Sequence, residues 1–143
     1  MYIAGMNNPH DATPIHSLMH AAGVLHERME RACEEAGITS AKYGPLSVLL
    51  QADAPLPLGE LADRVKCVRS NMTQLVDRLE ADGLVKRTND PGDRRVVRAE
   101  LTPVGRERAE NAARLVSQVE SEFTSSLSKA DRDAIDRILA ALG

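Results

Sequence analysis

The interpretation of this chain starts from residues 69–103, which read RSNMTQLVDRLEADGLVKRTNDPGDRRVVRAELTP. The first part of this stretch predicts a helix over residues 69–82, because apolar residues recur at spacings of three and four: Met72, Leu75, Val76 and Leu79. Gly83 is expected to end that helix, since glycine readily takes the left-handed conformation of a helix cap. A hydrophobic residue, Leu84, follows it.

Two strand-like runs come next, over residues 84–88 and 96–101. The segment between them, residues 89–95, is rich in turn-forming residues, so the two runs predict a β-hairpin. The tip of this hairpin is charged, because it carries Asp93, Arg94 and Arg95.

Upstream of the helix over residues 69–82, the apolar residues Leu61, Ala62 and Val65 indicate a short helix, and residues 66–68 form the turn between the two. A short helix, a tight turn, a second helix and a charged hairpin predict a mainly α fold with a small β-hairpin wing, the winged helix-turn-helix. The second helix of such a pair can enter the major groove of DNA. The hairpin can reach the minor groove, whose negative potential attracts arginine.

The candidate DNA-binding residues of the second helix lie off its apolar stripe. Arginine can bind guanine through two hydrogen bonds, asparagine or glutamine can bind adenine in the same way, and hydroxyl groups suit phosphates. These residues are Arg69, Ser70, Asn71, Thr73, Gln74 and Arg78, and the hairpin adds Asp93, Arg94 and Arg95. Asp93 can pair with Arg95 and direct it at the groove, or Arg94 can serve instead. The plainer alternatives are a solvated amphipathic helix and a surface turn with weak ion pairs.

The flanking segments are expected to be helical, after a loose arm over residues 1–12. Thr13-Pro14 starts a helix that ends at Gly37, and Thr39 starts a second one in which Pro45 predicts a kink or an irregular first turn. Residues 54–57 are interpreted as a break. Thr102-Pro103 starts a long helix to about residue 125, and a capping box at residues 128–131 starts the last one. The buried face of that last helix is predicted from Ile135, Ile138, Leu139 and Leu142.

Composition limits the class of protein. The chain has 143 residues, of which 43% are hydrophobic and only 2% aromatic, so the core is aliphatic and base stacking on aromatic platforms is disfavoured. The net charge of −3 does not by itself oppose DNA binding, because what matters is which side chains face outward together. Neither a signal peptide nor a membrane span is recognisable, which predicts a cytoplasmic protein with reduced thiols.

Five segments resemble the MarR (multiple antibiotic resistance regulator) family: residues 61–62, 73–80, 83–87, 90–95 and 101–105. The resemblance is dense over residues 58–105. It implies a single domain over residues 13–143, with a DNA-binding lobe at about 39–102 and dimerisation helices at about 13–37 and 103–143. It also implies a homodimer on a palindromic operator, usually a repressor, which is released by a small ligand or by thiol oxidation.

The resemblance places the ligand pocket near His26, Met29 and Tyr43. The chain departs from the family at Lys66 and Val68, where members commonly have glycine and a capping serine. Because valine offers no capping oxygen, we expect either a shifted start of the helix over residues 69–82 or compensation by Ser70.

Three further features leave alternatives open. Cys67, in the turn, is either a small buried hydrophobe or a redox-sensing thiol whose pKa the nearby cations lower. His16 and His20 lie one helical turn apart, but no third ligand accompanies them, so solvent-facing histidines are the simpler interpretation and no metal is predicted. The sequence contains no nucleophile elbow, phosphate-binding glycine loop or HExxH motif, so neither an enzyme nor a cofactor is predicted. A winged helix that binds proteins instead of DNA is the remaining alternative.

Overall fold

The computed structural model describes residues 13–143, so the arm expected at residues 1–12 lies outside the described residues. The chain forms six helices and a small sheet over this range. The elements follow in the order α1 (Pro14–Glu35), α2 (Ser40–Ala52), β1 (Leu56–Pro57), α3 (Leu58–Val65), α4 (Arg69–Ala81), β2 (Val85–Asn89), β3 (Val97–Leu101), α5 (Pro103–Ser125) and α6 (Lys129–Leu142). The predicted mainly α fold with a wing is confirmed.

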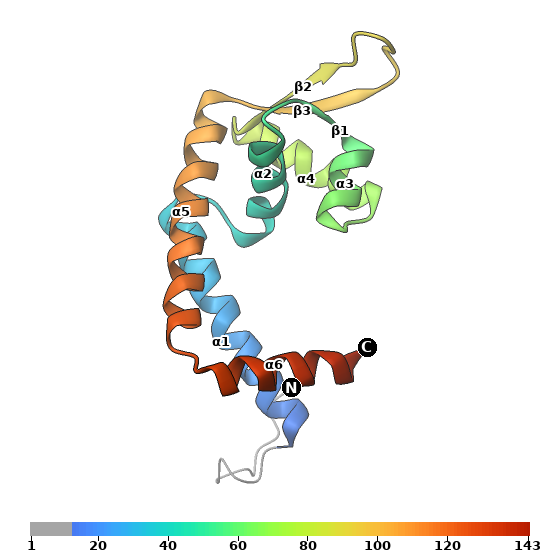
Figure 1. Ribbon diagram of the computed structural model, residues 1–143. Helices are drawn as coiled ribbons and strands as arrows, with labels where there is room; N and C mark the ends of the chain where they lie inside the picture. Colours follow the sequence, from blue (N-terminus) through green and yellow to red (C-terminus); the bar gives the residue numbers. More distant parts are fainter. Residues whose placement is uncertain (1–12) are drawn as a thin grey trace, which may run out of the picture.

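The winged lobe lies at one end of the molecule (Figure 1). There β2 and β3 form the hairpin beside α3 and α4, while α5 leads away from the sheet toward α6. The sheet is antiparallel in the order β1-β3-β2, with Leu56 opposite Ala99 and Val85 opposite Leu101. The break expected at residues 54–57 is therefore wrong in part, because Leu56 and Pro57 pair with β3 as a third strand. Proline is tolerated on this short edge strand, since an edge leaves some amide positions unpaired.

The helix starts follow the capping residues of the sequence. The Thr13 and Thr102 hydroxyls accept the amide N–H groups of His16 and Gly105, and Ser128 forms the predicted capping box with Asp131. Helix α2 continues through Pro45 without a break, and the kink or irregular first turn expected there stays a prediction. The Lys42 and Tyr43 amides both donate to the Thr39 carbonyl, at 3.1 Å each.

The hydrophobic core lies inside the winged lobe and at its junction with α1 and α5. It is aliphatic, as the composition predicts. Its largest fully buried side chains include Leu46, Leu49, Leu61, Met72, Leu79 and Leu84. The predicted inner face of α4 is confirmed at Met72, Val76 and Leu79, while Leu75 is partly buried.

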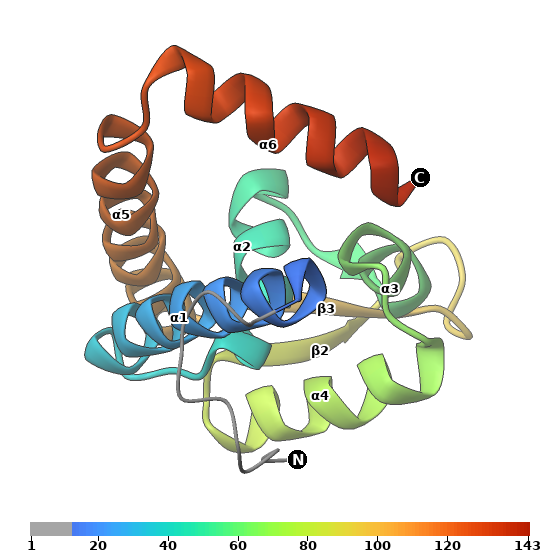
Figure 2. The same cartoon turned by 90° about the horizontal axis from the view of Figure 1, so that it is seen from below.

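The last helix differs from its prediction. Helix α6 has no buried residue: Ile138, Leu139 and Leu142 are 40%, 58% and 72% exposed. Figures 1 and 2 show α6 leaving the end of α5 well away from the α4 side of the lobe. The prediction that this face of α6 is buried is therefore wrong for the single chain, because no other part of the described chain covers it. The first half of α1 also exposes large apolar side chains, since Ile15 and Met19 are each 69% exposed.

Thr102 and Gly105 join the wing to α5. The Thr102 amide donates to the Leu84 carbonyl at 3.1 Å, and its hydroxyl donates to the Gly83 carbonyl at 2.6 Å while accepting the Gly105 amide at 3.0 Å. Gly105 itself lies directly against the Leu84 carbonyl. A Cβ added at Gly105 would stand 1.8 Å from that oxygen, so residue 105 must be glycine for this junction to form.

We expect Gly105→Ala to destabilise the protein by about 3 kcal/mol, because α5 must move away from the backbone of Leu84. Gly44→Ala is the matched control. Its added Cβ would meet the Val65 side chain at an ordinary 3.5 Å, so about 1 kcal/mol of helix propensity should be gained. Urea unfolding of both variants measures these changes. Equal stability of the two variants would contradict the close approach at Gly105.

Candidate nucleic-acid interface

Helix α4 presents two opposite faces. Met72, Val76 and Leu79 anchor one face in the core. All six candidate residues of this helix are exposed on the other side: Arg69, Ser70, Asn71, Thr73, Gln74 and Arg78. An amphipathic helix fixed in this way offers a continuous polar surface to a partner.

Two of these side chains are engaged locally. The Thr73 hydroxyl donates to the Arg69 carbonyl at 3.1 Å, so it would meet a partner as an acceptor. The Arg69 guanidinium lies across the start of α3, where a Cβ at Gly59 would be 3.2 Å from it. Arg69 therefore lies near α3. Asn71, Gln74 and Arg78 occupy exposed positions farther along α4.

The turn between α3 and α4 is unusual in sequence but regular in geometry. Lys66 adopts the left-handed conformation (φ 58°, ψ 48°), and the Cys67 amide donates to the Ala62 carbonyl at 2.9 Å. A side chain in this conformation costs about 1 kcal/mol relative to glycine. Helix α4 begins at Arg69 with Val68 as its cap and no side-chain capping bond. The helix start is therefore not shifted, and Ser70 does not replace the missing cap.

The tip of the wing holds Arg95 in a defined direction. The Asp93 carboxylate accepts the Arg95 amide at 3.0 Å and the guanidinium at 3.0 and 3.1 Å. The predicted pair is thus confirmed. These hydrogen bonds from Arg95 hold the pKa of Asp93 below its ordinary value. The Arg95 side chain is nevertheless 90% exposed, so it is oriented and still accessible. Arg94 is also exposed.

Arg87, on β2, links the wing to α4. Its amide and its guanidinium each donate to the Glu80 carboxylate at 3.0 Å, and the guanidinium also pairs with Asp77. Hydrogen bonding to Asp77 is the main reason that the pKa of Arg87 is raised. This arrangement sets the exposed face of α4 relative to the wing. The sequence analysis missed it, because residues 7 and 10 positions apart on different elements show no local pattern.

The two cysteines have different environments. Cys33 is fully buried, and burial raises the pKa of its thiol, which disfavours the reactive thiolate. Cys67 is half-buried beside the core, and its thiol donates to the Val68 carbonyl at 3.4 Å. This position suits the interpretation as a small hydrophobe, and the redox role of Cys67 stays a prediction.

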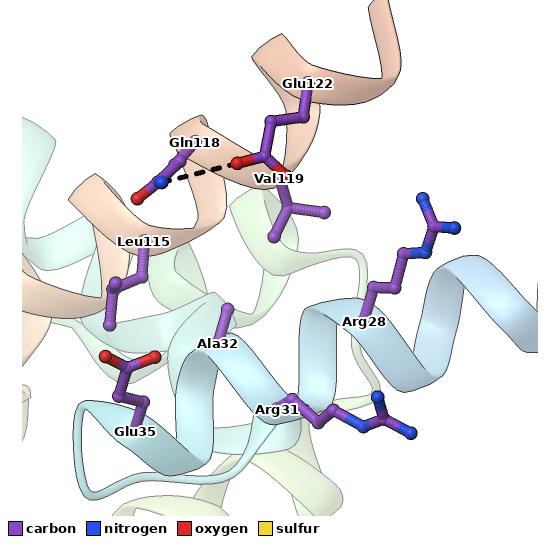
Figure 3. Close-up of a pocket in the computed structure, with 8 residues that line it drawn as sticks. All are labelled: Arg28, Arg31, Ala32, Glu35, Leu115, Gln118, Val119 and Glu122. Carbon is purple, nitrogen blue, oxygen red and sulfur yellow. Dashed lines mark hydrogen bonds between the residues drawn. The ribbon is translucent and has the colours of Figure 1, made fainter. Parts of the chain in front are cut away.

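A cavity of about 360 Å³ lies between α1 and α5 (Figure 3). Apolar side chains, including Ala32, Leu115 and Val119, line its centre, and charged groups stand at its edges: Arg28, Arg31, Glu35 and Glu122. The residues expected to line a ligand pocket are not among those that line this cavity. His26 is exposed, whereas Met29 and Tyr43 pack partly against the core. Their role stays a prediction.

Neither a metal cluster nor a membrane helix occurs in the described part of the chain. Residues 13–143 contain no group of three or more histidine, cysteine or carboxylate side chains arranged for a metal, and His10 lies outside this range. Within the same range, no helix is both long enough and apolar enough to cross a membrane.

Comparison with known proteins gives consistent matches. The model of the MarR family matches residues 39–97. An uncharacterised HTH-type transcriptional regulator of Bacillus subtilis, YsmB, is 34% identical over 89 residues, which are 62% of this chain and 60% of that protein. Matches to curated relatives cover 52–64% of those proteins.

Solved structures match over nearly the whole chain. The transcriptional repressor CouR, bound to a 23-mer DNA duplex, superposes with a TM-score of 0.75 at 28% identity, covering 99% of both chains. A second match is BpsR of Bordetella bronchiseptica, a protein whose binding to DNA is regulated by 6-hydroxynicotinic acid. It superposes with a TM-score of 0.73 over 96% of this chain and 97% of that one. Its 23% identity shows a shared fold alone.

Proposed function

We propose that the chain is a sequence-specific DNA-binding transcription regulator of the MarR family, whose model matches residues 39–97. One observation carries this proposal: Asp93 holds Arg95 at the tip of a wing that Arg87 ties to the recognition helix. In the proposed complex the exposed face of α4 enters the major groove, where asparagine, glutamine and arginine can distinguish base pairs. Arg95 then enters the adjacent minor groove.

We propose that the active form is a homodimer on a palindromic operator. The exposed apolar residues of α1 and α6 support this, since large apolar surfaces of this kind are normally covered by a partner. Two copies related by a two-fold axis would present two α4 helices to half-sites about one helical turn of DNA apart. Because a regulator that binds promoters acts where the genome lies, we propose that the protein works in the cytoplasm.

We propose that the regulator is a repressor that a small molecule releases. The name of the DNA-bound relative CouR, a transcriptional repressor, supports the direction of control. The effector pocket of the dimer is expected near His26, Met29 and Tyr43. The alternative, release by oxidation of Cys67, is less well supported, because this thiol is half-buried and already donates to a backbone carbonyl.

Catalysis and protein binding are the competing functions. Curated relatives such as YsmB are named as transcriptional regulators, so we propose binding and not catalysis as the activity. A winged helix that binds only another protein would have no use for a base-reading face on α4 together with an arginine held at the wing tip.

The test uses the full chain and a random-sequence pool of DNA duplexes. Repeated selection should enrich one palindromic sequence, and its affinity should fall by roughly 1000-fold between 50 and 200 mM salt, because phosphate contacts release counterions. A scrambled duplex of the same composition is the control. A pool that yields no enriched sequence would rule out sequence-specific recognition.

A further inference from the structure

The base of the wing contains an ion pair that the proposed recognition does not use. Asp90 follows β2, and Arg98 lies within β3. The guanidinium of Arg98 donates to Asp90 Oδ2 at 2.5 Å. The two side chains are only 29% and 22% exposed, in contrast to the 90% of Arg95. The pair therefore faces the wing itself and is poorly accessible to a duplex.

Asp90 also organises the loop at the tip. Its second carboxylate oxygen, Oδ1, accepts the Gly92 amide at 2.7 Å, and its own amide donates to the Val96 carbonyl at 2.9 Å. The Val96 amide in turn donates to the Asp93 carbonyl at 3.0 Å. These bonds form a continuous connection from Arg98 through Asp90 to Asp93, the residue that orients Arg95. The Gly92 amide and Arg98 lower the pKa of Asp90, so it is charged at neutral pH.

Arg98 depends on this one carboxylate. Its Nε is buried without a hydrogen-bond partner among the described residues, so this side of the guanidinium is desolvated. Burying a charged group without full compensation is costly unless a close opposite charge holds it there. Lys86 and Glu100 lie on the same face of the sheet as Arg98. They form an ordinary cross-strand pair at 3.5 Å, with side chains 60% and 37% exposed. The Asp90–Arg98 pair is the more enclosed of the two.

We propose that Asp90 and Arg98 are a positioning pair for DNA recognition, which holds the wing loop so that Asp93 presents Arg95 to the groove. This inference rests on the proposed function. Neither residue touches the DNA in this arrangement, and both act through Arg95.

The first test is a double-mutant cycle on DNA affinity, with the duplex that the wild-type chain selects from a random pool. Arg98→Gln should weaken binding by about 10-fold in the wild-type background. In the Arg95→Ala background the same substitution should weaken it by less than about 2-fold, because the arginine that it positions is gone. Lys86→Gln removes the same charge from the same face and should have an effect of about 2-fold or less in both backgrounds. Equal effects of Arg98→Gln in the two backgrounds would overturn the proposal.

The second test needs no DNA. Amide hydrogen exchange of the full chain should be faster at Gly92 and Arg95 in Arg98→Gln than in Lys86→Gln, and Arg98→Lys should restore part of the protection. Asp90→Asn is a second, milder variant if Arg98→Gln fails to fold, since it retains an acceptor for Gly92. Unchanged exchange at these amides would overturn the positioning role. Selection of no duplex would instead overturn the proposed function, and the two failures are therefore distinguishable.

Discussion

Replacing Leu139 and Leu142 together with glutamate is expected to convert the protein from a dimer to a monomer. These side chains are 58% and 72% exposed on α6, where they continue the apolar face that the single chain leaves uncovered. If that face is the dimer interface, two buried carboxylates without partners would weaken association by at least roughly 1000-fold. Operator affinity should fall by roughly 100-fold or more, because one winged lobe then holds only one half-site.

Sedimentation equilibrium measures the association, and fluorescence anisotropy with the selected duplex measures the DNA affinity. Arg137→Glu is the matched control, since it also adds an acidic residue to α6, on the opposite side of the helix by helical spacing. This variant should remain dimeric. A double-glutamate variant that still dimerises would exclude this face of α6 from the interface, and α1 and α5 would then have to supply the contact.

Arg95→Ala should weaken operator binding by roughly 100-fold while leaving the fold intact. Its guanidinium is oriented by Asp93 and is 90% exposed, so it contributes to binding and little to stability. A single arginine placed in a groove typically contributes about 1–3 kcal/mol to recognition, and the upper part of that range corresponds to this loss.

Arg94→Ala is the matched control for Arg95→Ala, because it removes the same charge from the adjacent exposed position. We expect it to weaken binding by about 10-fold or less, as a general loss of attraction to phosphate. Anisotropy titrations at one fixed salt concentration compare the two variants, and thermal unfolding checks that both are folded. Equal losses for the two variants would mean that the wing contributes charge without a preferred arginine.

Several parts of this structure follow from local sequence. The capping residues Thr13, Thr102 and Ser128 start their helices in the structure as the sequence predicts, since a cap is a contact between residues only three apart. The hairpin between residues 84 and 101 is confirmed within one residue at its ends, because the strands flank a turn whose residue types are diagnostic. The Asp93–Arg95 pair is equally local.

Other parts could not be predicted in this way. Strand β1 consists of Leu56 and Pro57 alone and forms only because β3 provides a partner edge about 40 residues later. The ties from Arg87 to α4 and from Arg98 to Asp90 depend on how the wing folds back on its neighbours. Periodicity also identified an apolar face on α6 but not whether the chain itself covers it.

By itself, the sequence determined the helices with their caps, the hairpin and the residue types on the candidate DNA-binding surface. All of these depend on interactions within a few positions along the chain, which a pattern of residue types can record. Only the tertiary structure decided which arginines remain accessible and which are enclosed in the wing, and that the apolar faces of α1 and α6 stay open. Accessibility depends on what packs against a side chain in space, and residues far apart in the sequence provide that packing.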